Sequence, residues 1–244
     1  MTIKNSIRTV LIIPCFNESQ RLKIEYYNEL LPNLLNIGCK VIFVDDGSTD
    51  DTLSILKSNF SNYSDIISVT KNCGKADAIR EGILYSLKSY DSEYVGFLDA
   101  DCAFGQNDVL QIVNFANNDG ANSAFFASRV KLAGHEINRN PWRHFFGRTI
   151  STILNFNSKI KIYDPQCGLK IFKTYLIQNE LLNQKFRTRW FIDVELIYRI
   201  GLDELKIIEF PIKSWSDIKG SKIKLIQIPR IMYELISVLR IKEK

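Results

Sequence analysis

Short apolar runs alternate with longer amphipathic segments through the first hundred residues of the chain. The apolar runs are rich in β-branched and aromatic residues, as is typical of buried strands. They predict strands at Thr9–Ile13, Lys40–Val44, Ile66–Val69 and Tyr94–Leu98. The amphipathic segments predict helices at Gln20–Ile37, Asp50–Asn59 and Lys75–Ser89. This strand–helix alternation predicts an α/β fold with a mostly parallel central sheet and helices on both faces.

The alternation becomes less regular after Asp101. The later segments predict helices at Asp108–Ala116, Pro141–Phe156, Trp190–Ile200 and Pro229–Arg240, and strands at Ser123–Ala127, Gly168–Phe172 and Leu205–Ile212. No linker rich in proline, glycine or serine separates these segments. We therefore expect one domain over residues 1–218, with residues 219–244 forming a basic amphipathic C-terminal helix of the same unit.

Composition is ordinary for a globular protein, with 45% hydrophobic and 24% charged residues. The formal net charge is +5, but the basic residues are clustered. Five Lys or Arg stand against one acidic residue between Arg129 and Arg148, and seven stand against two between Lys219 and Lys244. Such clusters are typical of a solvated face, and they also suit phosphates or an anionic membrane surface.

The five cysteines are scattered and form no CxxC pair, which argues against a zinc site or a disulfide framework. Residues 1–9 lack the apolar segment of a signal peptide, and no run of 18 apolar residues predicts a membrane-spanning helix. We therefore expect a cytoplasmic location.

Three of the predicted strands end in polar residues. These strand ends are Pro14–Glu18, Asp45–Ser48 and Asp99–Asp101. Ligands of open α/β sheets bind beyond the carboxyl ends of the strands, so we expect these segments to share one edge. Carboxylates gathered there would repel each other unless a cation or hydrogen-bond donors lay between them.

Asp99 and Asp101 have the spacing of a two-carboxylate metal site. Residues i and i+2 of an extended chain point the same way, and Mg²⁺ or Mn²⁺ prefers such hard oxygen ligands. The alternative is that both aspartates cap the helix beginning near Asn107. Asp45 and Asp46 are candidates to accept hydrogen bonds from a nucleoside, or they serve ordinary turn chemistry.

Lys75 follows a glycine but does not belong to a Walker A phosphate-binding loop. The first glycine of that motif is missing, and Ala76 stands where serine or threonine is required. A lysine at a helix start can nevertheless meet a donor phosphate.

Together these segments resemble the family-2 inverting glycosyltransferases with the GT-A fold. The resemblance runs in order along almost the whole chain. Its motifs are PCFNE (Pro14–Glu18), VDDGSTDDT (Val44–Thr52), NCGKADAIREG (Asn72–Gly82), FLDADCAF (Phe97–Phe104), ASR (Ala127–Arg129), DPQCGLKIF (Asp164–Phe172), RWFIDVEL (Arg189–Leu196) and GSK (Gly220–Lys222). The downstream motifs are most similar to those of the dolichyl-phosphate β-glucosyltransferases and, more loosely, of other polyprenyl-phosphate hexose synthases.

The resemblance implies a role for each matching residue. A nucleotide-diphospho-sugar donor, UDP-glucose, would be held by Pro14, Phe16, Glu18, Asp45, Asp46, Lys75, Asp99 and Ala100, and by Ser221 and Lys222 of a closing loop. Asp101, with Asp99, would hold the Mg²⁺ or Mn²⁺ ion. Arg129 and Arg148 resemble the arginines that bind the acceptor phosphate of a polyprenyl phosphate. We expect no nucleic-acid partner.

The nature of the acceptor decides whether the enzyme needs a general base. A lipid phosphate is already anionic, so it attacks without deprotonation, and arginines bind its oxygens. A sugar hydroxyl needs a base, and Asp193 is the candidate. The alternative for Asp193 is a helix residue paired with Arg189 or Arg187.

Two segments, Trp142–Phe156 and Ile228–Ile241, mix apolar and basic residues as interfacial helices do. They predict peripheral contact with the cytoplasmic face of a membrane; packing on the core or on a second subunit of a homo-oligomer is the alternative. The leading hypothesis is an inverting hexosyltransferase acting on a polyprenyl phosphate. The alternatives are a polysaccharide-building glycosyltransferase and an inactive nucleotide-sugar-binding or scaffold module.

Overall fold

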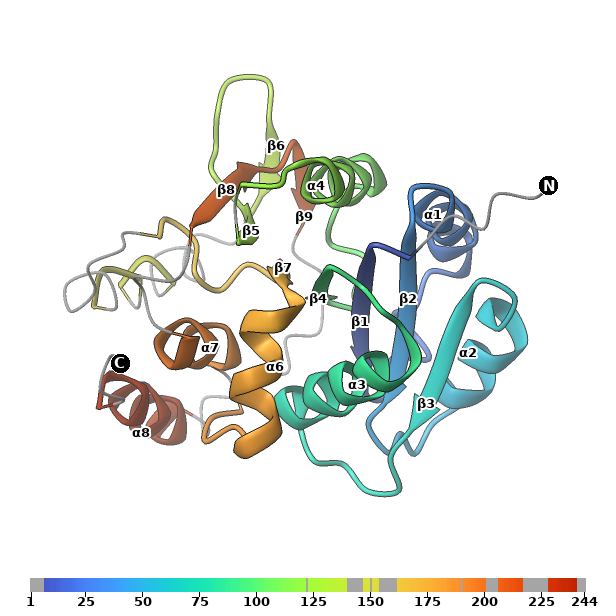
Figure 1. The fold of residues 1–244 in the computed structure, drawn as a ribbon, viewed down its shortest axis with the longest axis horizontal. Coiled ribbons are helices and arrows are strands. Elements are labelled where there is room, and N and C mark those ends of the chain that lie inside the picture. Colours follow the sequence, from blue (N-terminus) through green and yellow to red (C-terminus); the bar gives the residue numbers. More distant parts are fainter. Residues whose placement is uncertain are drawn as a thin grey trace.

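The computed structural model describes residues 7–121, 123–139, 147–149, 151–153, 162–189, 191–200, 206–216 and 228–240. Its centre is a seven-stranded sheet with the order β3-β2-β1-β4-β7-β5-β8 (Figure 1). The strands are β1 (Thr9–Cys15), β2 (Cys39–Asp45), β3 (Ser64–Ser68), β4 (Tyr94–Leu98), β5 (Ala124–Ser128), β7 (Leu169–Lys173) and β8 (Ile207–Pro211). Neighbours in this sheet are parallel, except that β7 runs antiparallel to both β4 and β5.

Helices cover both faces of the sheet. One face carries α1 (Ile24–Asn36), α2 (Thr52–Phe60) and α4 (Gln106–Asn118). The other face carries α3 (Lys75–Ser89), α6 (Thr174–Asn183) and α7 (Ile192–Ile200). Helix α8 (Ile228–Leu239) packs beside α7 (Figure 1). The α/β sandwich expected from the sequence is therefore confirmed.

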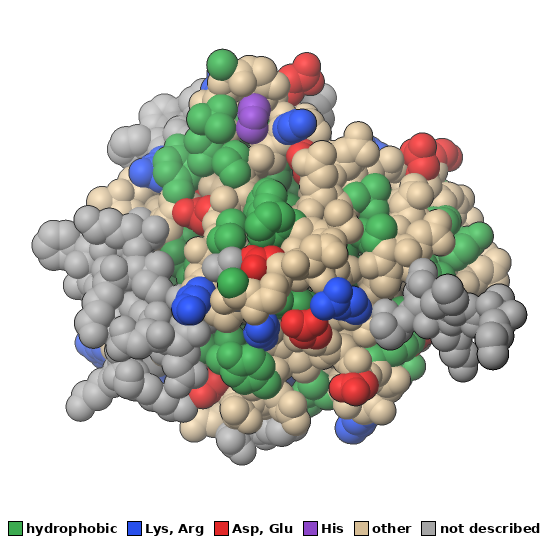
Figure 2. Space-filling view, turned by 45° about the horizontal axis from the view of Figure 1, so that its top comes forward, with side chains coloured by type: hydrophobic (Ala, Val, Ile, Leu, Met, Phe, Trp, Pro, Cys, Tyr) green, Lys and Arg blue, Asp and Glu red, His purple; other side chains and the backbone are tan. Residues whose placement is uncertain are grey.

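Strand β1 shows why the sheet is buried on both sides. Val10 and Ile12 pack under α3, whereas Leu11 and Ile13 pack under α1 and α2, and all four are fully buried. An interior parallel strand needs such a continuous apolar run, because helices cover both of its faces. Among the described residues on the face seen in Figure 2, charged side chains of both signs lie between hydrophobic ones.

Several predicted boundaries differ from the structure. Helix α1 begins at Ile24 rather than Gln20, because the amides of Arg21 and Leu22 both donate to the Glu18 carbonyl oxygen and close a turn there. Helix α6 was not expected, and it buries Leu176 and Ile177 against the sheet. Of the predicted helix Pro141–Phe156, residues 147–149 and 151–153 are described and are helical.

A small second sheet was also not expected. It pairs β6 (Glu136–Asn138) with β9 (Ser214–Ser216) in parallel. The Asp108 carboxylate holds the approach to β9, accepting hydrogen bonds from the amides of Lys213 and Ser214, each at 2.9 Å. Asp108 therefore joins the start of α4 to the segment that follows β8.

We predict that Gly96→Ala destabilises the central sheet. An added Cβ at this β4 position would lie 2.3 Å from the Lys170 carbonyl oxygen and 2.9 Å from the Ile171 Cα, so β7 would have to move. We expect the free energy of unfolding to fall by about 2 kcal/mol, measured by urea denaturation. Gly120→Ala is the control, since its Cβ would meet nothing within 4 Å. Equal stability of the two variants would contradict this packing.

Candidate functional site

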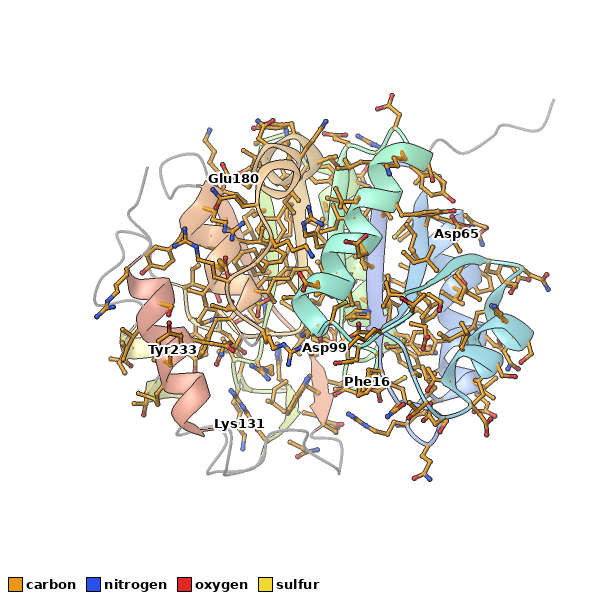
Figure 3. All side chains as sticks on the ribbon, turned by 90° about the horizontal axis from the view of Figure 1, so that it is seen from below. Phe16, Asp65, Asp99, Lys131, Glu180 and Tyr233 are labelled. Atoms are coloured by element: carbon orange, nitrogen blue, oxygen red, sulfur yellow. The ribbon has the colours of Figure 1, made fainter. Side chains whose placement is uncertain are left out.

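The polar strand ends meet at one edge of the sheet, as expected. The carboxyl ends of β1, β2, β4 and β5 lie there, and so does the beginning of β7, because that strand is antiparallel. The Asp46 amide donates to the Cys15 carbonyl oxygen (2.8 Å) and the Asp99 amide to that of Gly168 (2.9 Å). Figure 3 shows Phe16 and Asp99 close together in that view, on the segments that follow β1 and β4.

Asp99 forms an ion pair with Lys75, the first residue of α3. The Lys75 Nζ lies 2.5 Å from Asp99 Oδ1, and about a third of each side chain is exposed (37% and 34%). Burial opposes the charge of Lys75, but the carboxylates of Asp99 and Asp193 outweigh it and raise the pKa of Lys75 to about 12. Gly168 packs directly on this pair, because a Cβ there would lie 2.1 Å from Asp99 Oδ2.

Asp101 lies beside a cation that the sequence interpretation missed. The Arg21 guanidinium contacts Asp101 Oδ2 and Glu18 Oε2, each at 3.4 Å. Burial and the nearby Asp99 carboxylate raise the pKa of Asp101, while the Ala103 amide (3.2 Å) and Arg21 oppose the shift. The signal for Arg21 in the sequence is a basic residue in the turn after a polar strand end.

The backbone around Asp99 and Asp101 has an unusual conformation at Cys102 and a buried hydrogen bond at Ala100. Cys102 has a φ of 56°, in the left-handed region that residues other than glycine adopt uncommonly. The Ala100 carbonyl oxygen accepts a hydrogen bond from the buried Tyr27 hydroxyl at 3.0 Å. Helix α4 begins at Gln106 without a side-chain cap. The alternative that Asp99 and Asp101 cap this helix is therefore wrong.

The acidic pair fits a divalent cation that takes its other ligands from a substrate. No group of three or more His, Cys, Asp or Glu side chains suited to a metal occurs within the described ranges. That Asp99 and Asp101 hold a metal stays a prediction. Mg²⁺ is commonly bound by one or two carboxylates together with substrate phosphates and water.

Asp45 and Asp46 have different surroundings. Asp45 Oδ2 accepts one long hydrogen bond from the Ser48 amide (3.4 Å), and Oδ1 is buried without a hydrogen-bond partner among the described residues. A buried acceptor without a donor is costly, so Asp45 suits a nucleoside donor group.

Asp46 is instead saturated by the loop before α3. Its two oxygens accept from the Asn72 side chain (2.8 Å), the Cys73 amide (2.8 Å) and thiol (2.9 Å), and the Gly74 amide (2.9 Å). These hydrogen bonds fit the alternative of turn chemistry for Asp46, while its contact with a nucleoside stays a prediction. Asp46 fixes the loop that places Lys75.

The remaining nucleoside candidates lie along the same edge. Pro14 is the penultimate residue of β1, Phe16 follows that strand and is half-buried, and Glu18 is buried. The Glu18 amide donates to the Thr52 hydroxyl at 2.8 Å, which ties this segment to the start of α2. Ser221 and Lys222 lie outside the described residues.

Asp193 pairs with a lysine rather than an arginine. The Lys170 Nζ on β7 lies 3.5 Å from Asp193 Oδ1, and both side chains are buried. Burial raises the pKa of Asp193, while Lys170 and Lys75 act in the opposite direction. The sequence interpretation missed Lys170, whose signal is a charged residue inside a buried apolar strand.

The suggested partners of Asp193 are used elsewhere. The Arg187 amide donates to Glu195 (2.9 Å) and the Arg189 amide to Glu234 (2.9 Å). The Arg189 guanidinium donates to the Cys73 carbonyl oxygen at 3.3 Å. Among the described residues the ion pair of Asp193 is with Lys170 and not with either arginine, so the alternative pairing with Arg187 or Arg189 is wrong.

Arg129 and Arg148 bind two residues that are adjacent in the chain, Asp164 and Tyr163. Arg129 binds Asp164 through two parallel hydrogen bonds, Nε to Oδ2 (2.7 Å) and one terminal nitrogen to Oδ1 (2.8 Å). Burial opposes the charge of Asp164, but Arg129 lowers the pKa of that carboxyl to about 2. Arg148 donates to the Tyr163 carbonyl oxygen (3.0 Å) and lies 4.3 Å from the centre of the Tyr163 ring. The two arginines therefore lie on the same side of the site. The Asp164 carboxylate already accepts hydrogen bonds from Nε and one terminal nitrogen of Arg129.

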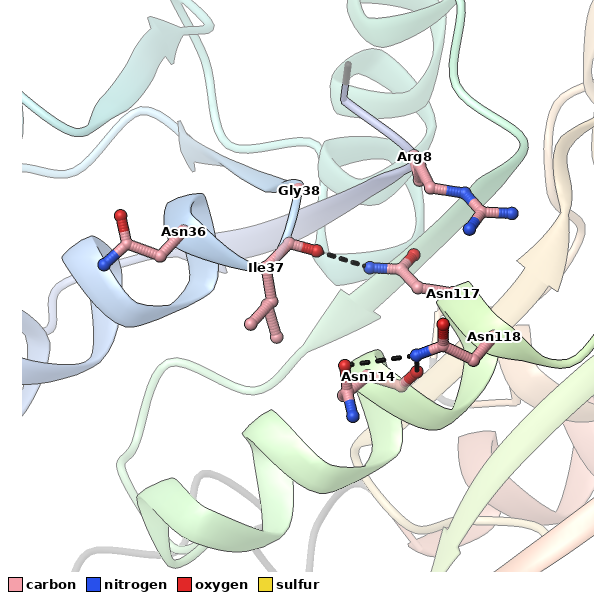
Figure 4. A pocket seen from close by; sticks show the side chains of 7 residues that line it. All are labelled: Arg8, Asn36, Ile37, Gly38, Asn114, Asn117 and Asn118. Carbon is pink, nitrogen blue, oxygen red and sulfur yellow. Dashed lines mark hydrogen bonds between the residues drawn. The ribbon is translucent and has the colours of Figure 1, made fainter. Parts of the chain in front are cut away.

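A pocket at the opposite edge of the sheet has a different character. Its polar groups bind one another: Asn117 donates to the Ile37 carbonyl oxygen and Asn118 to that of Asn114, each at 2.7 Å (Figure 4). It is lined by Arg8, Asn36, Ile37, Gly38, Asn114, Asn117 and Asn118. Arg8 and Gly38 precede β1 and β2, so this pocket lies away from the carboxylates.

Curated relatives resemble the chain over most of its length. The chain is 25% identical to a dolichyl-phosphate beta-glucosyltransferase of Trichomonas vaginalis, covering 96% of this chain and 71% of the relative. It is 28% identical to the dolichyl-phosphate beta-glucosyltransferase of Saccharomyces cerevisiae (88% and 69% covered) and 29% identical to that of Homo sapiens (87% and 68% covered).

Solved structures show the same GT-A fold. Glucosyl-3-phosphoglycerate synthase from Mycobacterium tuberculosis, crystallised with Mn²⁺, UDP and glucosyl-3-phosphoglycerate, matches with a TM-score of 0.68 at 16% identity. The match covers 97% of this chain and 80% of that one. Residues 10–180, well over half of the chain, match the family described as Glycosyl transferase family 2. The chain therefore belongs to glycosyl transferase family 2.

Proposed function

We propose that the protein transfers glucose from UDP-glucose to a polyprenyl phosphate, with inversion at the anomeric carbon. The observation that carries the proposal is the row of Lys75, Asp99, Asp101 and Arg21 at the carboxyl edge of the sheet. The names of the three relatives described above, each a dolichyl-phosphate beta-glucosyltransferase, support the acceptor. An intact, charge-balanced acidic pair argues against the inactive scaffold.

On the donor side, Asp45 accepts a hydrogen bond from the nucleoside through Oδ1, which accepts none from the part of the chain that the structure describes. Pro14, Phe16, Glu18 and Ala100 line the nucleoside site with it, while Asp46 keeps the loop in place. Asp99 and Asp101 hold Mg²⁺ or Mn²⁺, which supplies positive charge to the departing pyrophosphate. Lys75 lies beside the same phosphates, and Lys222 with Ser221 completes the donor site in this proposal.

On the acceptor side, the lipid phosphate attacks the anomeric carbon as the bond to the UDP oxygen breaks. Its second pKa is about 6, so no enzyme base has to remove a proton. Arg148 is the arginine available to a phosphate, because its guanidinium makes one hydrogen bond and one ring contact among the described residues. Arg129 is a positioning residue in this proposal, because it holds Asp164 and the start of β7 in place.

We further propose that the outer face of α8 makes peripheral contact with the membrane. Its Tyr233 is 71% exposed, whereas Glu234 and Leu235 are buried on the inner face. Met232 (40%) and Ile236 (45%) share the exposed face. None of the described helices has the length and apolarity to cross a bilayer. A second subunit in a homo-oligomer is the alternative occupant of this face.

The direct test supplies Mn²⁺ and UDP-[¹⁴C]glucose with vesicles that contain a polyprenyl phosphate. We expect label in the organic-soluble lipid fraction, released as glucose by mild acid. Vesicles containing the neutral polyprenol are the matched control and should remain unlabelled. Label that appears only in a water-soluble polysaccharide would contradict the lipid acceptor.

The Asp193→Asn variant separates the two acceptor classes. A hydroxyl acceptor needs a base, and its loss costs about 10²-fold or more in kcat. A phosphate acceptor needs none, so we expect kcat to stay within about tenfold of the native value in the same assay. A larger loss with an intact fold would favour the polysaccharide-building alternative, which is supported by the buried Oδ1 of Asp193, an atom that accepts no hydrogen bond from any described residue.

A further inference from the structure

Lys170 is a completely buried lysine in the middle of the sheet. Its side chain has 0% exposure. It lies opposite Phe97 of β4 and Phe126 of β5, with Nζ 5.8 Å and 5.2 Å from the centres of their rings. The Nζ donates to the Cys167 carbonyl oxygen at 2.6 Å, which fixes the ammonium group at the start of β7.

The fixed ammonium group faces Asp193 on α7. It lies 3.5 Å from Asp193 Oδ1, which has no hydrogen-bond partner within the described part of the chain. Burying a carboxylate and an ammonium group destabilises the folded state unless the two charges compensate each other. Structure alone gives little reason to keep such a pair, because two apolar residues would pack there at no such cost.

The pair continues the row of charges at the donor site. The Nζ atoms of Lys170 and Lys75 both lie near the Phe97 ring, 5.8 Å and 6.0 Å from its centre. Lys75 in turn binds Asp99, the residue that ends β4. Asp193 also acts on the charge of Lys75, so Asp193 belongs to the same group of charges as Asp99.

We propose that Asp193 accepts a hydrogen bond from a hydroxyl group of the transferred hexose, and that Lys170 is the positioning residue that fixes the Asp193 carboxylate for it. The inference rests on the proposed function, because a phosphate acceptor leaves Asp193 without a proton to remove. A carboxylate held in one orientation accepts a hydrogen bond from a hydroxyl at a defined place on the sugar ring. No proton is transferred in this role.

The test compares UDP-glucose with UDP, which lacks the hexose, by calorimetry in the presence of Mn²⁺. For Lys170→Met we expect the Kd of UDP-glucose to rise about tenfold, the scale of one charge-assisted hydrogen bond, while the Kd of UDP stays within about twofold. Lys173→Met is the matched control on the same strand, since Lys173 binds the Gly120 carbonyl oxygen (3.3 Å) on the outside, and both affinities should be unchanged.

A second pair of variants removes the risk that Lys170→Met fails to fold around an uncompensated Asp193. In the Asp193→Asn background, adding Lys170→Met leaves no buried charge at this place, and we expect no further loss of UDP-glucose affinity. Additive losses, an equal loss for UDP, or no effect of Lys170→Met would overturn the inference. Native protein that binds neither UDP nor UDP-glucose would instead overturn the proposed function together with it.

Discussion

The carboxylates of Asp46, Asp99 and Asp101 are stable side by side because each faces a cation or a set of hydrogen-bond donors. Lys75 balances Asp99, Arg21 lies against Asp101, and the loop before α3 saturates Asp46. Without these partners, carboxylates at one sheet edge would raise one another's pKa and lose their charge. Burial and the neighbouring Asp99 carboxylate nevertheless raise the pKa of Asp101. A divalent cation beside Asp101 would favour the charged form of its carboxyl group.

The antiparallel strand β7 makes this arrangement possible. By entering the sheet between β4 and β5, it delivers its first residues to the same edge as the carboxyl ends of the other strands. Gly168 then packs against Asp99, and the preceding Asp164 receives Arg129. Lys170 places a charge between two aromatic rings on the face covered by α7. One strand thus joins the donor side of the site to the acceptor side.

The fold and the acidic edge were predictable from the sequence, because both leave local signals. Asp45 and Asp99 directly follow buried apolar runs, and Asp101 comes two residues after Asp99, so the strand ends could be predicted in order. Helix α6 was not predictable in this way, since it starts at Thr174 immediately after β7 without a turn sequence. The pairs Lys170–Asp193 and Arg129–Asp164 join segments distant in the chain, and no periodicity records them. The saturation of Asp46 is likewise a property of the folded loop.

The account depends on Asp99 and Asp101 joining the donor pyrophosphate through a divalent cation, and metal-dependent UDP-glucose binding tests this most directly. Calorimetric titrations with and without Mn²⁺, on native protein and on Asp101→Asn, separate the contribution of the cation from that of the nucleoside site. The account predicts that Mn²⁺ strengthens native binding by about tenfold or more, and that this gain disappears in Asp101→Asn. Equal affinity in native protein with Mn²⁺, in chelator and in the variant would contradict it.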